Sequence, residues 1–226
     1  MTMSSTYPAA LAAADPSVRL RAALHAGSHP DDAHVGRLVQ RCAVETDFYV
    51  RDMLTWALTR HSRSSTIPLL ESVLSDDAQP PQAHAQALHT LSKLAAPETW
   101  PAITPELLRS ADDEVARAAW RAAVEVVPDQ EVASLADELA AQLGSGDVER
   151  RRSLSRALVA LGESGVARAE AVAATSADAR VVAHAAATVR LALDPDAAFA
   201  DDVGTAWRLL SPDAGGDAEE AGREDR

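Results

Sequence analysis

Residues 47–61, DFYVRDMLTWALTRH, put one set of side chains on a broad face at helical spacing, namely Val50, Leu54, Ala57, Leu58 and His61. In a strand, apolar residues would alternate with polar ones. Thr46 or Asp47 can begin the helix, because the side-chain oxygen of either residue can accept a hydrogen bond from a free N–H group of the first turn. The stretch therefore predicts an amphipathic helix.

Similar stretches recur along the chain. Asp-x-x-Val openings occur at residues 15–18, 47–50 and 112–115, each before a run rich in alanine and leucine. Aligning one apolar position of each run predicts six helix pairs of about 33 residues. The aligned positions are Val18, Val50, Ala83, Val115, Arg150 and Val181. The fifth position is aligned through Leu154, Ala157 and Leu158, and no segment has the alternating β-branched pattern of a strand, so the predicted class is all-α.

The repeated pattern resembles HEAT-like repeats, in the short form found in bacterial proteins of the phycobilisome-lyase type. The similarity lies in the Asp-x-x-Val-Arg openings at 15–19 and 47–51, in the run 87–94, and in a proline, Pro105, within an expected first helix. The chain also looks like stand-alone HEAT-repeat proteins of high-GC bacteria. The resemblance implies a right-handed α-solenoid whose second helices line the concave surface, and it implies protein binding rather than a reaction.

The expected repeat domain spans residues 8–210. Its units are predicted at 8–30, 31–62, 63–96, 97–128, 129–162 and 163–193, followed by a C-terminal capping helix at 194–210. Residues 1–7 are predicted to be disordered. Residues 211–226 are acidic, contain three glycines and lack large apolar side chains, which predicts a disordered acidic tail.

Composition narrows the class of protein further. The chain has 226 residues, with 21 Lys+Arg against 34 Asp+Glu and a net charge of −13. Its single cysteine, Cys42, excludes an intramolecular disulfide and a multi-cysteine zinc site, and its place on an apolar helix face predicts a buried thiol. Neither a signal peptide nor a run of about 18 apolar residues is evident, so we expect a cytoplasmic protein without a membrane span.

One stripe of the second helices is the predicted partner-binding surface. Positions two and six after the aligned apolar residue are four apart, so they share a helix face that points away from the packed side. The stripe holds seven candidate residues: Asp52, Trp56, His89, Arg117, Arg121, Arg152 and Arg156. It predicts a groove for an acidic or aromatic-anchored peptide, in which arginines pair with carboxylates and Trp56 is the anchor. The alternative is structural, with arginines lying over apolar surface and Trp56 as a half-buried rim residue.

No catalytic, cofactor-binding or metal-binding residue is predicted. The histidines include no His-x-x-x-His pair around a glutamate, and Gly144-Ser-Gly146 lacks the Lys-Ser/Thr continuation of a phosphate loop. We therefore expect a non-enzymatic scaffold or adaptor for an unidentified protein or peptide. Two alternatives stay open, a DNA-binding protein like the HEAT-like alkylpurine DNA glycosylases and a chromophore-lyase-like role. The net charge of −13 makes nucleic acid an unfavourable partner.

Overall fold

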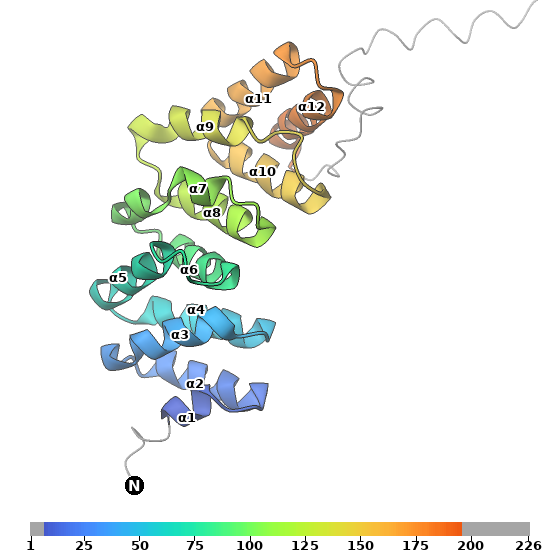
Figure 1. Ribbon diagram of the computed structural model, residues 1–226. Coiled ribbons are helices and arrows are strands. Elements are labelled where there is room, and N and C mark those ends of the chain that lie inside the picture. Colours follow the sequence, from blue (N-terminus) through green and yellow to red (C-terminus); the bar gives the residue numbers. More distant parts are fainter. Residues whose placement is uncertain (1–6, 196–226) are drawn as a thin grey trace, which may run out of the picture. The chain divides into compact units, whose positions relative to one another are not determined.

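The structure, a computed structural model, describes residues 7–195, and this part of the chain is all-helical, without a strand (Figure 1). The expected all-α class is therefore confirmed. By its internal contacts the chain divides into two compact units, unit 1 over residues 1–129 and unit 2 over residues 130–226. The boundary lies where the fifth helix pair is expected to begin.

Helices alternate with short connections in both units. The α-helices of unit 1 are α1 (Tyr7–Leu11), α2 (Pro16–Ser28), α3 (Val35–Val44), α4 (Phe48–Arg60), α5 (Arg63–Leu74), α6 (Pro81–Leu94), α7 (Pro105–Leu108) and α8 (Asp113–Val126). Short 3-10 helices are η2 (Asp32–His34), η3 (Pro97–Ala102) and η4 (Asp129–Glu131). The described helices of unit 2 are α9 (Val132–Ala140), α10 (Val148–Ala160), α11 (Glu163–Thr175) and α12 (Ala179–Leu193).

Aspartates begin most of the even-numbered helices. In each case the carboxylate accepts a hydrogen bond from a backbone N–H group of the first turn, which has no partner within the helix. These N-caps are Asp15, Asp47, Asp112, Asp147 and Asp178. Helix α6 instead follows Pro80 and has Pro81 in its first turn. The six aligned positions of the sequence, Arg150 included, all lie three residues after the cap.

The arginines that directly follow two of these aligned positions, Arg19 and Arg51, donate hydrogen bonds to the loop before their own helix. Arg19 donates from one guanidinium nitrogen to the carbonyl oxygens of Ala13 and Ala14, both at 2.8 Å. Arg51 contacts the carbonyls of residues 45 and 46 in the same way, at 3.3 and 3.4 Å. The arginine of the Asp-x-x-Val-Arg pattern is thus a structural residue that stabilises the turn between two helices.

Unit 1 packs its helices in two rows. Among the even-numbered helices α2 contacts α4, α4 contacts α6 and α6 contacts α8, while α3 contacts both α1 and α5 in the other row. Alanine and leucine fill the interfaces, and Trp120 of α8 is 1% exposed, with its indole N–H donating to the carbonyl of Leu108 at 2.8 Å. Trp120 is thus part of the packing between helices.

Unit 2 shows the same arrangement over its described helices, since α9 contacts α11 and α10 contacts α12. A buried polar cluster joins its second row. The backbone N–H of Gly144 donates to Nδ1 of His184 at 2.9 Å, which leaves the ring proton on Nε2, 2.9 Å from the carbonyl oxygen of Arg151. Ser155 and Thr188 lie 2.6 Å apart beside the same ring. His184 therefore ties α12 to α10 and to the loop before it.

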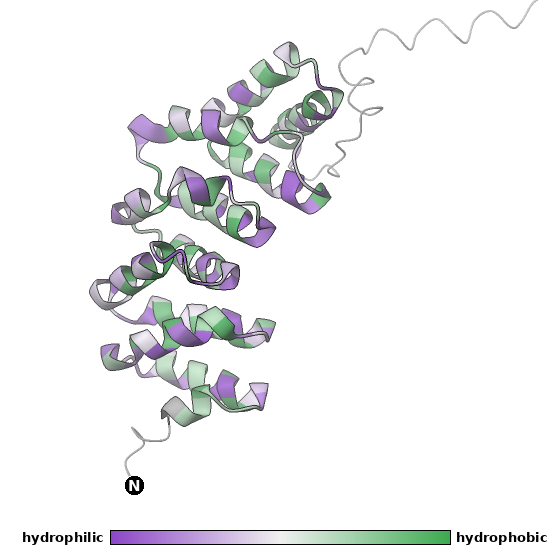
Figure 2. Cartoon of the chain, viewed as in Figure 1, coloured by the Kyte–Doolittle hydropathy of each residue, from purple (hydrophilic) through white to green (hydrophobic). Residues whose placement is uncertain are grey.

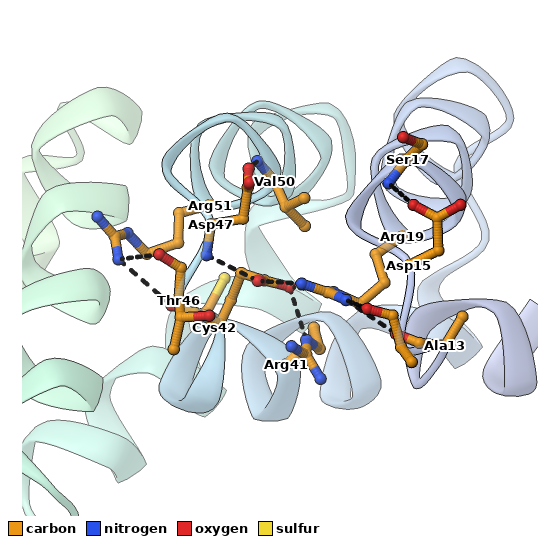
Figure 3. Close-up of polar contacts among 12 residues, drawn as sticks. Ala13, Asp15, Ser17, Arg19, Arg41, Cys42, Thr46, Asp47, Val50 and Arg51 are labelled. Carbon is orange, nitrogen blue, oxygen red and sulfur yellow. Dashed lines mark hydrogen bonds and ion pairs between the residues drawn. The ribbon is translucent and has the colours of Figure 1, made fainter.

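A buried carboxylate joins the first helix pairs of unit 1. Glu45, which follows α3, is fully buried. Arg19 of α2 donates one hydrogen bond to each of its two carboxylate oxygens, both at 2.7 Å. Arg41 donates to one of these oxygens at 2.9 Å, and the backbone N–H of Asp47 donates to the other at 2.9 Å (Figure 3). Gln82 of α6 donates to the Glu45 backbone carbonyl at 2.7 Å. One residue thereby contacts three successive even-numbered helices or their caps.

This network predicts acid sensitivity in unit 1. Burial by itself raises the pKa of Glu45, but hydrogen bonds from Arg19, the Asp47 N–H and Arg41 outweigh it and hold the pKa at about 2, below the 4.5 of a free side chain. Stability from Glu45 is thus complete above pH 4.5 and is lost as the pH falls towards 2, by about 3 kcal/mol. Urea unfolding followed by tryptophan fluorescence between pH 2 and 6 measures this slope. In Glu45→Gln, which cannot titrate at this position, the free energy of unfolding should fall by about 3 kcal/mol less between pH 6 and pH 2. The same pH dependence in both proteins would contradict the assignment.

The proline predicted inside a first helix lies at the start of a helix instead. Pro105, expected inside a first helix, is the first residue of α7, where its missing N–H needs no partner, whereas Pro68 lies inside α5. The predictions for residues 1–7, for the capping helix at 194–210 and for the acidic tail at 211–226 fall wholly or almost wholly outside the described residues.

Candidate functional site

A groove with a volume of about 360 Å³ opens on the even-numbered row of unit 1. It crosses α4, α6 and α8, and its charged and aromatic lining residues are Phe48, Arg51, Asp52, Asp112, Glu114 and Arg121. Gln82, Gln86 and His89 line it on α6, between the other two helices. The groove is thus built from side chains of three helices that neighbour one another in the even-numbered row.

Three predicted site residues meet in this groove. Asp52 of α4, His89 of α6 and Arg121 of α8 all line it, and none of their side chains has a hydrogen-bond or ion-pair partner among residues 7–195. Asp52 and Arg121 are exposed, whereas His89 is half-buried. The alignment of the second helices therefore brought together side chains that lie 37 and 32 residues apart in the chain.

The electrostatics around His89 connect these residues. Burial lowers the pKa of His89, the charges of Arg121 and Lys93 lower it further, and Asp52 opposes them. The imidazole is therefore neutral near pH 7. Burial and the nearby Arg117 lower the pKa of Arg121, but a guanidinium keeps its charge at any physiological pH. At neutral pH the unpaired charges of the groove are one carboxylate, on Asp52, and one guanidinium, on Arg121.

Other polar residues of the lining are already engaged. Arg51 and Gln82 donate to backbone carbonyls, and Gln86 donates to the Thr55 hydroxyl at 2.7 Å. Asp112 caps α8, and Glu114 forms an ion pair with Arg117. The lining therefore carries both signs of charge, with three carboxylates against two arginines.

Two aromatic side chains at the start of α4 were not among the sequence candidates. Phe48 is 65% exposed and lines the groove, and Tyr49 beside it is 72% exposed, with its ring edge-on to Phe48 at 5.5 Å. Consecutive residues of a helix do not share a face, so the two rings cannot both reach a core. The chain holds only two phenylalanines and two tyrosines, so two adjacent ones in a helix's first turn were the available sequence signal.

Trp56 lies on the predicted stripe but has a packing role. A Cβ added to Gly27 of α2 would overlap the six-membered ring of Trp56, lying 2.6 Å from Cε3. The indole thus lies against the bare backbone of α2, and the side chain is 37% exposed. Trp56 does not line the groove over α4, α6 and α8. The position of Trp56 thus agrees with the structural alternative, in which it is a half-buried residue at the rim and not a binding anchor.

The other three arginines are placed differently from Arg121. Arg117 of α8 pairs with Glu114, and its buried Nε has no hydrogen-bond partner in the described part of the chain. Arg152 and Arg156 belong to α10 of unit 2, where Arg152 is half-buried and Arg156 is exposed. Unit 1 therefore holds one unpaired arginine of the predicted cluster in its groove.

The thiol and the other histidines that could act in catalysis or bind a metal lie outside the groove, and the thiol is buried. Cys42 is buried, and burial raises the pKa of its thiol to about 12, so it carries no thiolate at neutral pH. His25 and His29 stack on each other at 4.5 Å at the end of α2. Residues 7–195 contain no group of three or more histidine, cysteine, aspartate or glutamate side chains able to hold a metal ion.

Comparisons with known proteins leave the family open. No family model matches the chain, and no curated protein matches it.

Over residues 7–195, no helix combines the length and the apolar character needed to cross a membrane. Figure 2 shows polar residues interspersed with apolar ones along these helices, as expected where each helix packs on one face only.

Proposed function

We propose that the chain is a right-handed solenoid of about six HEAT-like helix pairs that binds a protein partner through the groove of α4, α6 and α8. Aspartate caps recur at similar spacing in both units, and helices in both units pack in two rows, which supports the repeat interpretation. The proposal includes a cytoplasmic location, in keeping with a single buried cysteine.

The observation that best supports a binding function is the exposed ring of Phe48. It lies beside a groove in which three polar side chains lack a hydrogen-bond or ion-pair partner among the described residues. An apolar side chain with 65% of its surface in water and a neighbouring hollow of about 360 Å³ are features of interaction sites. Asp52, His89 and Arg121 supply an acceptor, a neutral imidazole and a donor that a polypeptide can satisfy. Binding by such a surface needs no reaction, so the proposal is a non-enzymatic adaptor.

A polypeptide fits this groove better than a nucleic acid. Three of the five charged lining residues are carboxylates, which repel a phosphate backbone, and the whole chain carries a net charge of −13. Arg51, one of the two cations, already donates to backbone carbonyls of its own loop. The alternative of a DNA-binding protein is therefore an outcome to be tested rather than a second proposal.

Site-specific photo-crosslinking tests the proposal directly. The crosslinking amino acid p-benzoylphenylalanine replaces Ala85, which lines the groove on α6, and in a control chain it replaces exposed Ser72 on α5 of the other row. Irradiation in nuclease-treated lysate of the source cells should give a discrete protein adduct from position 85. The same adduct should be absent from position 72 and should weaken when Phe48→Ala is added to the position-85 chain.

Each other result has a definite meaning. The same adducts from both positions, or no adduct from position 85, would overturn the proposed groove. Adducts that form only in a parallel lysate without nuclease treatment would favour nucleic acid and the DNA-binding alternative instead.

A further inference from the structure

The two unpaired charges of the groove have opposite signs and lie on different helices. Asp52 is on α4 and Arg121 is on α8, with α6 and the neutral His89 between them. Both side chains and His89 line the same groove, so a ligand that spans it can meet both charges. The groove therefore offers a carboxylate on α4 and a guanidinium on α8, neither with a partner in the described part of the chain.

We propose that this groove binds an extended peptide segment that carries a cationic side chain at the Asp52 end and a carboxylate at the Arg121 end, about five or six residues apart. The inference rests on the proposed function and deepens it, because it names the chemistry and spacing of the segment that the groove selects.

The α4 end is suited to a cation. Phe48 and Asp52 are four residues apart on α4 and so lie on one face, and both line the groove. A partner arginine or lysine can place its charge over the exposed Phe48 ring while it pairs with the Asp52 carboxylate. Arg51 also lines this end, but its guanidinium is turned to the carbonyls of residues 45 and 46.

The α8 end is suited to a carboxylate. Arg121 is exposed, and no residue of the described chain forms an ion pair with it. The nearest acidic lining residues are occupied, since Glu114 pairs with Arg117 and Asp112 caps α8. A guanidinium with free donors takes a carboxylate through two parallel hydrogen bonds, which makes it selective for that group.

Helix geometry sets the spacing of the two ligand charges. Packed helices lie about 8–10 Å apart, so two steps from α4 to α8 span about 16–20 Å. An extended chain advances about 3.3 Å per residue, so about five or six residues bridge the two charges. The half-buried His89 and the side-chain oxygens of Gln82 and Gln86 lie along this path and can meet the peptide backbone.

Fluorescein-labelled peptides with one arginine and one glutamate in a Gly/Ser/Ala background test this inference by fluorescence polarisation at low ionic strength. Two peptides have the charges five residues apart, one with arginine first and one with glutamate first, and a third has them two residues apart. The full chain should bind at least one of the two five-spaced peptides about tenfold more tightly, or better, than the short-spaced peptide, whose charges cannot reach both ends of the groove.

Removing the two charges of the groove should abolish the preference for the longer spacing. The variant Asp52→Asn with Arg121→Gln keeps the net charge and alters two exposed side chains, so circular dichroism should match the unmodified chain. The control variant Arg37→Gln with Glu125→Gln removes two exposed charges outside the groove and should keep the preference.

Three results would overturn the inference. These are equal binding of the five-spaced and short-spaced peptides, an unchanged preference in the variant without the two groove charges, and no peptide binding at millimolar concentration. If position 85 nevertheless crosslinks a protein, the adaptor proposal stands and the dipolar ligand alone is wrong. If neither experiment detects binding, both proposals fail.

Discussion

Replacing Glu45 with leucine should lower the free energy of unfolding of unit 1 by about 3–5 kcal/mol, because it leaves the buried guanidinium of Arg19 without its countercharge. Arg19 is 5% exposed and would keep only the two carbonyl acceptors of the loop before α2. Urea unfolding at pH 7, followed by tryptophan fluorescence, measures the change, because three of the four tryptophans of the chain, Trp56, Trp100 and Trp120, belong to unit 1.

Two further variants separate the ion pair from general damage. Adding Arg19→Met to Glu45→Leu should restore part of the loss, because a buried pair replaced by apolar side chains costs less than an isolated buried charge. Glu125→Leu on exposed α8 surface should change stability by less than about 0.5 kcal/mol. A double variant as unstable as the sum of its single variants would show that the pairing of Arg19 and Glu45 contributes nothing.

Gly165→Ala should destabilise unit 2 by about 3 kcal/mol, although alanine is the better helix former. Gly165 is buried in α11, where an added Cβ would overlap the carbonyl oxygen of Leu158 in α10 and lie 2.8 Å from its carbonyl carbon. The obstacle is backbone, so α10 and α11 would have to separate. Urea unfolding followed by circular dichroism gives the loss, and hydrogen exchange should show lost protection in these two helices.

Gly36→Ala is the matched control for this effect. Gly36 lies in α3, and an added Cβ meets no atom within 4 Å. Here only backbone entropy and helix propensity change, so the variant should gain up to about 1 kcal/mol. If both alanine variants stabilise the protein, the close approach of α11 to α10 is wrong.

Local features of the fold were predictable from the chain. The spacing of Val50, Leu54 and Leu58 predicts α4, and Asp47 marks its first turn, because both signals lie within one helix. The same reasoning aligned Arg150 with the apolar positions, and Asp147 does cap α10 three residues earlier. Glu45 was not singled out, since its partner Arg19 lies 26 residues away and no local pattern marks a buried carboxylate.

The candidate site was predictable in part. Helical spacing brought Asp52, His89 and Arg121 to one groove, as expected because positions two and six after the aligned residues share a helix face. Spacing could not show that Trp56 lies against Gly27, because that contact depends on a missing side chain in another helix. Phe48 was overlooked because it comes before the aligned apolar position of its helix.

Periodicity and capping belong to single helices, so the amino-acid sequence was sufficient to define the all-α class, the start of most second helices and the face that each turns away from the core. The availability of a charged side chain is different, because it depends on which neighbour neutralises it first. Arg117 pairs with Glu114, while Arg121 one turn later has no partner among the described residues, although both share the predicted stripe. The pair of Glu114 and Arg117 is local to α8, but whether a side chain of another helix reaches Arg121 was decided only when α4, α6 and α8 packed together.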